Sequence, residues 1–141
     1  MRLYTFTNSY LSPIQCGIQT AHIVSELSVT FKNTYYYDEW SRNHKTIIVC
    51  NGGNQAALEN LAHELSLLTI ELYNHEFYTY AELSNQIPVS KFYEDSKSLG
   101  GALTAVGIIL PEDIYNPSHL SPHNEHKLKI TDLIKSYKLA G

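Results

Sequence analysis

Residues 92–111, FYEDSKSLGGALTAVGIILP, join two segments that are typical of neighbouring strands. Residues 87–93, IPVSKFY, alternate in part between apolar and polar side chains and predict the first of these strands. Residues 103–110, LTAVGIIL, are the most apolar segment of the chain and predict the second. The link between them is short and contains Gly100 and Gly101. We therefore expect an antiparallel hairpin.

A strand and a helix are predicted near the amino end of the sequence. Residues 3–7, LYTFT, are rich in β-branched and aromatic side chains and predict a strand. Ser12 is a good N-cap, and Pro13 fits the first position of a helix. Apolar residues recur at helical spacing from Ile14 to Leu27, so we expect one buried helix face.

A second strand–helix unit follows. Residues 45–50, KTIIVC, form an uninterrupted apolar run, which predicts a central strand covered on both faces. NGGN at 51–54 is a turn signal, and Asn54 can cap a helix with a leucine and alanine stripe. Residues 128–139 predict a closing amphipathic helix. Strand–helix units favour parallel pairing, so the fold class is α/β, a single domain with a four-stranded mixed sheet and helices on both faces.

Composition narrows the classes of function. The 141 residues suit one domain, and 43% apolar with 17% charged residues is a globular composition. The net charge of −4 argues against extensive binding of duplex nucleic acid, which calls for a basic excess. No apolar run reaches membrane-spanning length, and the first residues lack a signal-peptide core. We expect a cytoplasmic protein that binds no membrane.

Three weaker patterns each have a structural alternative. His119, His123 and His126 invite a zinc site, but their Pro/Ser/Asn surroundings favour a solvated loop, so we expect no metal or cofactor. Gly52 and Gly53 lack the residues of a phosphate-binding loop and indicate a tight turn. The aromatic residues between 35 and 40 can stack on bases, although such residues more often cover the edge of a core.

The loop inside the opening stretch carries candidate chemistry. Asp95 and its neighbour Glu94 follow a strand, where open α/β sheets carry functional loops, and a carboxylate there can orient water or act as a base. A plain polar hairpin is the structural alternative. On the first helix, Gln19 and His22 share a face, and a core histidine is the alternative there. The other candidates supply hydroxyl groups, a positive charge and close backbone approach: Ser96, Ser98, Thr104, Lys97, Gly100 and Gly101.

Four motifs taken in order resemble the peptidyl-tRNA hydrolase 2 family. They are a helix with Gln-x-x-His, at Gln19 to His22; Trp40 before the strand KTIIVC; the turn and striped helix NGGNQAALENLAHEL; and Asp95 followed by the strand TAVGI and Pro111. The resemblance covers residues 1–115, with an insertion at about 69–86. Residues 116–141, a histidine-containing loop and a helix, form a C-terminal extension. The family fold is a four-stranded mixed sheet with helices on both sides.

The resemblance implies an activity, site residues and partners. Family members cleave the ester that joins a peptide to the terminal ribose of tRNA, and they often pair as homodimers. Asp95 corresponds to the aspartate that orients water, Thr104 to the threonine that opens the last strand, and His22 to the histidine facing the cleft. The remaining positions would bind the tRNA 3′ end or a related acyl-RNA: Gln15, Gln19, Ser96, Lys97, Ser98, Gly100 and Gly101.

The chain departs from the family at the lysine signature before the first helix. Residues 12–15, SPIQ, stand where the family has Gly-Lys-Gly-Lys, so Gln15 takes the place of the last lysine. Lys97 or Lys91 are candidate replacements for that charge. The alternative function is a catalytically inactive module on the same fold. It would bind a protein or a nucleotide through the segment from Tyr35 to Trp40 and the insertion at 69–86.

Overall fold

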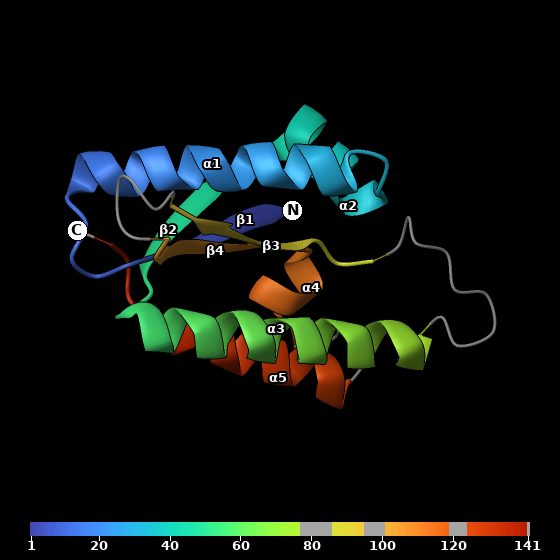
Figure 1. The fold of residues 1–141 in the computed structure, drawn as a ribbon. Coiled ribbons are helices and arrows are strands. Elements are labelled where there is room, and N and C mark those ends of the chain that lie inside the picture. The colour runs from blue at the N-terminus through green and yellow to red at the C-terminus, as the bar shows by residue number, and fades with distance from the viewer. Residues whose placement is uncertain (77–85, 95–100, 119–123, 141) are drawn as a thin grey trace.

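The computed structural model describes residues 1–76, 86–94, 101–118 and 124–140 (Figure 1). These residues form one α/β domain with a four-stranded sheet between layers of helices. The elements in chain order are β1 (Arg2–Thr7), α1 (Pro13–Phe31), α2 (Tyr35–Glu39), the π-helical turn η1 (Trp40–His44), β2 (Ile47–Asn51), α3 (Gln55–Glu76), β3 (Val89–Tyr93), β4 (Leu103–Leu110), α4 (Glu112–Tyr115) and α5 (Glu125–Lys135).

The sheet is mixed, as the sequence predicts. Its strand order is β2-β1-β4-β3. Strand β1 runs parallel to β2, and β4 is antiparallel to both β1 and β3. The hairpin of β3 and β4 is therefore confirmed. In consequence the carboxyl ends of β1, β2 and β3 lie at the same end of the sheet as the start of β4.

The prediction that β2 is a central strand is wrong. The strand lies at the edge of the sheet, and Ile47 at its start is 41% exposed. The outer edge of β2 is covered by a late segment of the chain. The Asn51 amide donates to the carbonyl of Lys138 at 2.9 Å, and the Ala140 amide donates to the carbonyl of Val49 at 2.9 Å. Along β2 only Cys50 is buried, so the apolar run does not mark a strand covered on both faces.

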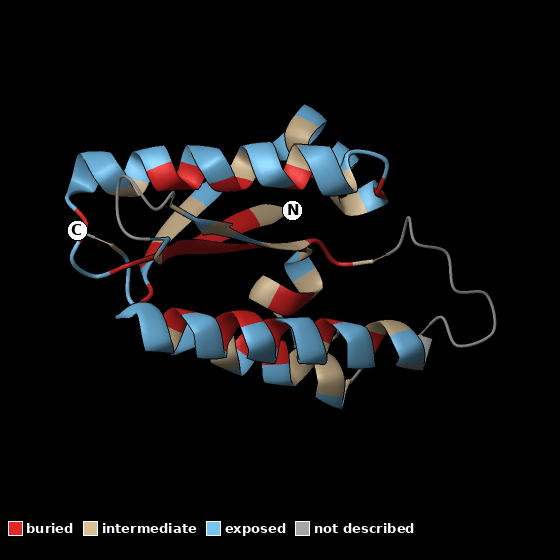
Figure 2. Cartoon of the chain, in the orientation of Figure 1, coloured by how far each residue is buried: buried red, intermediate tan, exposed pale blue. Residues whose placement is uncertain are grey.

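Helices cover both faces of the sheet and create two cores (Figure 2). Helix α1 and the η1 turn lie over one face, where Ile23, Leu27 and Trp40 pack on residues of β1 and β4. Helices α3, α4 and α5 lie over the other face and enclose the larger core. Every residue of β4 is buried, because this strand is covered on both sides.

Local signals in the sequence explain where the helices begin. The Ser12 hydroxyl accepts from the Gln15 amide at 3.2 Å, which confirms Ser12 as the N-cap of α1 with Pro13 following. The Asn54 side chain accepts from the Ala57 amide at 2.9 Å and caps α3. The closing helix differs from its predicted span of 128–139. It begins at Glu125, because Asn124 caps it, and ends at Lys135.

Parts of the segments predicted as an insertion and an extension belong to the described domain. Residues 69–76 continue α3 to Glu76, and residues 77–85 lie outside the described part of the chain. Ile130 and Ile134 of α5 belong to the core beneath the sheet, and Tyr137 packs edge-on against Phe6 at a centroid distance of 4.9 Å. Among the described residues, no helix is long and apolar enough to cross a membrane.

The aromatic segment after α1 covers a core edge. Trp40 is 4% exposed, and its indole Nε1 donates to the carbonyl of Thr46 at 2.8 Å. Tyr36 and Tyr37 are half-buried, whereas Tyr35 is exposed. The Trp40 ring is therefore part of the fold and does not offer a free face for a base.

Candidate functional site

The candidate site lies at the end of the sheet where β1 and β3 finish and β4 begins, beneath the first turns of α1 (Figure 1). The backbone ties these segments together. The Asn8 amide donates to the carbonyl of Thr104 at 3.0 Å, and the Glu94 amide donates to the carbonyl of Ala102 at 2.9 Å. Glu94 and Ala102, which lie on either side of residues 95–101 in the sequence, are therefore neighbours in space.

Three side chains from different elements form a hydrogen-bonded chain at this end. The Thr104 hydroxyl donates to Gln19 Oε1 at 2.9 Å, and Gln19 Nε2 donates to Glu94 Oε2 at 2.8 Å. Thr104 is fully buried and Gln19 is 4% exposed, whereas Glu94 is half-buried. We call these residues the Thr104–Gln19–Glu94 chain.

This chain fixes the direction of a buried amide. A hydroxyl donor on one side and a carboxylate acceptor on the other leave the Gln19 amide a single orientation that satisfies both. The buried polar groups are therefore paired and do not incur the free-energy cost of an unsatisfied donor or acceptor. The carboxylate of Glu94 is held towards α1, and Asp95 is the next residue in the sequence.

His22 lies one helical turn beyond Gln19 and close to the same strand. Its imidazole stacks on the Phe92 ring with centroids 4.2 Å apart and planes inclined by 4°. His22 is exposed, so it is not the buried core histidine of the alternative interpretation. The ring is held in place by this stacking.

Gln15 has a structural role at the start of α1. Its Oε1 atom accepts from the Ser12 amide at 2.9 Å, and its own amide donates to the Ser12 hydroxyl. The two residues form a capping box, which satisfies two backbone donors of the first helical turn. The side chain expected to replace a signature lysine is thus engaged at the end of the helix.

Five predicted site residues lie outside the described part of the chain, namely Asp95, Ser96, Lys97, Ser98 and Gly100. Gly101 is described and has a φ of +76°, a left-handed conformation that favours glycine. The structure therefore brings together Gln19, Thr104 and Glu94, with His22 nearby. It leaves the placement of the loop residues as a prediction.

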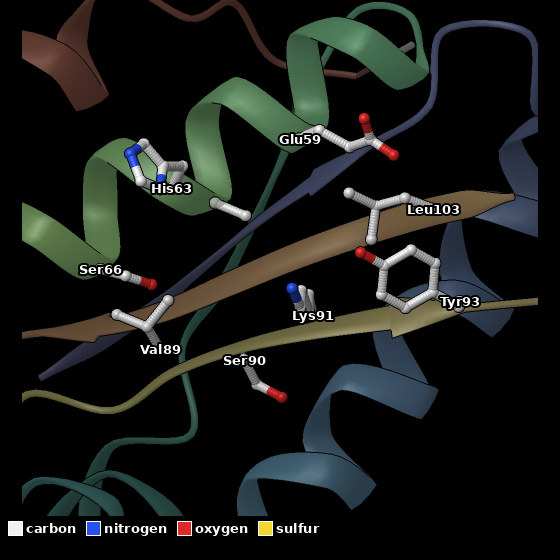
Figure 3. Close-up of a pocket in the computed structure, with 9 residues that line it drawn as sticks. Glu59, His63, Ser66, Val89, Ser90, Lys91, Tyr93 and Leu103 are labelled. Carbon is white, nitrogen blue, oxygen red and sulfur yellow. The ribbon is translucent and has the colours of Figure 1, made fainter.

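Lys91 lies on the other face of the sheet from His22. Its ammonium group is 5.4 Å from the centre of the Tyr93 ring, and both side chains line a cavity of about 480 Å³ between β3 and α3. Figure 3 shows Lys91 and Tyr93 beside Glu59 and His63 of α3. Side chains alternate along a strand, so Lys91 and Phe92 point to opposite faces. Lys91 is thus not a replacement for the missing lysine at the Gln19 site.

Glu94 belongs to the site, although the sequence indicates it only as one of two carboxylates at a strand end. The resemblance points to its neighbour Asp95. A signal was present, since Phe92 and Glu94 are two residues apart and share a face of the strand. That face is the one beneath α1, because Phe92 stacks on His22.

The cysteines and histidines form no metal site in the described residues. No three His, Cys, Asp or Glu side chains gather there closely enough to hold an ion. His126 lies 4.0 Å from Glu71, while His119 and His123 fall outside the described ranges. Burial raises the pKa of the Cys50 thiol to about 11, so this thiol stays protonated at neutral pH.

Comparison with known proteins does not assign the chain to a family. No protein-family model matches it, and no curated protein is significantly similar to it. The resemblance to peptidyl-tRNA hydrolase 2 accordingly rests on the motifs of the chain itself.

Proposed function

We propose that the protein hydrolyses the ester between a peptidyl group and the 3′ ribose of tRNA, or a closely related acyl-RNA ester. The observation that carries the proposal is the contact between Thr104 and Gln19. Two motifs of the resemblance, 85 residues apart in sequence, are joined here by a hydrogen bond of 2.9 Å. The Glu94 carboxylate, which accepts from Gln19 and precedes Asp95 in the sequence, completes the arrangement.

The proposed reaction needs a water molecule, a base and a stabilised oxyanion. The water oxygen attacks the ester carbonyl carbon, and the bond from that carbon to the ribose oxygen breaks. The ribose oxygen takes up a proton, which yields a free carboxylic acid and free tRNA. In this proposal Asp95 orients the water, while hydroxyl groups of Ser96 or Ser98 stabilise the developing negative charge.

The remaining residues of the proposal bind and position. Gln19, held between Thr104 and Glu94, fixes the α1 side of the site. His22 lies at the edge of that side, is exposed, and would contact the substrate there. Lys97 would contact a phosphate of the tRNA 3′ end, and Gly100 and Gly101 would let the backbone approach the ester closely.

A second candidate function is binding without catalysis on the same fold. The engagement of Gln15 in the capping box favours it, because the position of the signature lysine then offers no charge and its side-chain oxygen is bound to the Ser12 amide. A protein of this kind would bind a peptide, a protein or a nucleotide and would leave the ester intact.

Release of free tRNA from N-acetyl-aminoacyl-tRNA tests the proposal. Wild type is compared with Asp95→Ala, Thr104→Val and the control Thr20→Val. The control also removes a hydroxyl between α1 and the sheet, because the Thr20 and Thr5 hydroxyls are 2.9 Å apart and buried. We expect turnover by wild type and the control. Asp95→Ala should lose at least about tenfold, since a group that acts on the attacking water typically contributes 10²–10⁴-fold. Thr104→Val should show a smaller loss, because Thr104 acts through the position of Gln19.

The outcomes separate the two candidates. Absence of turnover by wild type, at protein concentrations equal to that of the substrate, removes the hydrolase and leaves the binding module. An equal loss in Thr20→Val and Thr104→Val would assign the effect to packing of α1 and not to the site. Circular dichroism of each variant checks that the fold is intact.

A further inference from the structure

A cavity of about 470 Å³ lies beside the candidate site, where the carboxyl ends of β1 and β2 meet the first turns of α1. Ala140, in the segment that covers β2, closes one side of it. A smaller, overlapping cavity of about 50 Å³ reaches Thr7 and Asn8 at the floor. Ligands of open α/β sheets bind at this end, outside the carboxyl ends of the strands.

Gly17 lines this cavity, and the packing of the protein does not explain why this position is a glycine. A methyl group built on its α-carbon meets no atom within 4 Å, so no neighbouring backbone requires the glycine. A glycine inside a helix lowers its stability by about 1 kcal/mol relative to alanine. The missing side chain leaves room on the cavity side of α1, and a ligand that approaches the helix backbone would use that room.

The chemistry of the lining selects an uncharged, aliphatic ligand. Leu11, Pro13 and Val49 supply apolar surface, and Ser9, Cys16 and Asn51 supply neutral polar groups. Among the described residues that line the cavity, none carries a charge or an aromatic ring. A phosphate would lack a cation here, and a nucleobase would lack a ring on which to stack.

The floor of the cavity connects directly to the Thr104–Gln19–Glu94 chain. The Asn8 amide donates to the carbonyl of Thr104 at 3.0 Å. The Thr7 hydroxyl donates to Cys16 Sγ at 3.2 Å, and Cys16 precedes Gln19 by three residues on α1. A substrate whose ester lies at the candidate site would thus have this space beside it for the group attached to the carbonyl carbon.

We propose that this cavity holds the uncharged acyl or peptidyl group of the substrate, an inference that rests on the proposed function. The cavity would select aliphatic side chains at the residue next to the ester. The tRNA part would extend to the other side of the Thr104–Gln19–Glu94 chain.

Binding is tested with N-acetyl-leucinamide, which presents an aliphatic side chain between two neutral amides. Amide proton–nitrogen spectra are recorded while N-acetyl-leucinamide is added to about 50 mM. This concentration is on the order of the Kd of a weakly binding fragment. We expect resonances of Gly17, Val49 and Asn51 to shift in wild type and in Gly17→Ala. Gly17→Leu extends a side chain into the space and should abolish these shifts. Absence of shifts at these residues in wild type overturns the proposal.

Selectivity is tested with two substrates, N-acetyl-leucyl-tRNA and N-acetyl-glycyl-tRNA. We expect Gly17→Leu to lower kcat/KM for the leucyl substrate at least about tenfold more than for the glycyl substrate, as a filled apolar pocket does. Gly17→Ala is the matched control and should keep the wild-type ratio. Because a Cβ at Gly17 meets open space, Gly17→Ala should fold, and circular dichroism checks the fold of Gly17→Leu.

Failure of the cavity and failure of the hydrolase give different results. If Gly17→Leu hydrolyses both substrates as wild type does, the cavity is not the acyl site and the hydrolase stands. If wild type binds N-acetyl-leucinamide at the cavity but releases no tRNA, the hydrolase fails and the claim about its acyl group fails with it. The cavity then remains as a site of the binding module.

Discussion

Removing the Thr104 hydroxyl should destabilise the protein through the amide that it supports. Thr104→Val keeps the shape of the side chain and deletes one donor. Gln19 Oε1, in a residue that is 4% exposed, then loses the 2.9 Å hydrogen bond from Thr104. A buried acceptor left without a donor costs about 1–3 kcal/mol of unfolding free energy.

A double-mutant cycle isolates this contribution. Gln19→Met removes the amide but keeps a side chain of similar length, and the Thr104 hydroxyl then retains the Phe92 carbonyl as an acceptor at 3.3 Å. Once the amide is gone, Thr104→Val no longer strands an acceptor. We expect the double variant to be more stable than the sum of the single effects predicts, by about 1 kcal/mol or more.

Urea unfolding, followed by circular dichroism, measures the four free energies. Thr20→Val serves as the control, because its hydroxyl pairs with Thr5 and touches neither member of the cycle. Additivity within about 0.3 kcal/mol, the usual result for independent sites, would refute the reasoning. It would mean that the Gln19 amide finds another partner when Thr104 is changed.

Three further predictions follow from burial and from strand geometry. Gly107→Ala should destabilise by about 1–3 kcal/mol in urea unfolding, because its methyl group would overlap the buried side chain of Ile23; unchanged stability would contradict that packing. Burial raises the pKa of the Cys50 thiol from 9.0 to about 11, so above pH 9 the thiol ionises first in the unfolded state. The free energy of unfolding is therefore unaffected by this thiol below pH 9 and decreases as the pH rises from 9 to 11. Between pH 9 and pH 11 wild type should therefore lose up to about 2 kcal/mol more than Cys50→Ala, and parallel curves would contradict this. Lys91→Ala should leave tRNA release within about twofold of wild type, as its side chain lies on the far face; a large loss would place the site differently.

Much of the fold could be predicted because its signals are local. The cap at Ser12, the cap at Asn54 and the glycine-containing hairpin each depend on a few neighbouring residues, and the structure has all three. The place of β2 could not be predicted this way. An apolar run does not say where in the sheet a strand lies. The residues that pair with this edge, 138–140, come almost 90 positions later in the sequence.

The candidate site was predictable in its parts and not in its connections. Gln19 and Thr104 were selected separately, from a helix pattern and a strand pattern. Their hydrogen bond depends on how α1 lies across the sheet, which no local pattern specifies. Two adjacent carboxylates follow the strand, and the sequence does not say which of them meets Gln19; the resemblance points to Asp95. Ser12 and Gln15 have the spacing of a capping box, so the capping role of Gln15 was predictable, although the resemblance places this residue at the position of a lysine.

The cover over the edge of β2 has a consequence for biosynthesis. The backbone groups of Val49 and Asn51 on that edge pair with Ala140 and Lys138. During translation β1, β2 and α3 emerge well before these residues, so a nascent chain presents an open strand edge. Open edges can pair with strands of other chains. Until residues 138–140 have left the ribosome, this edge is therefore open to pairing with other chains.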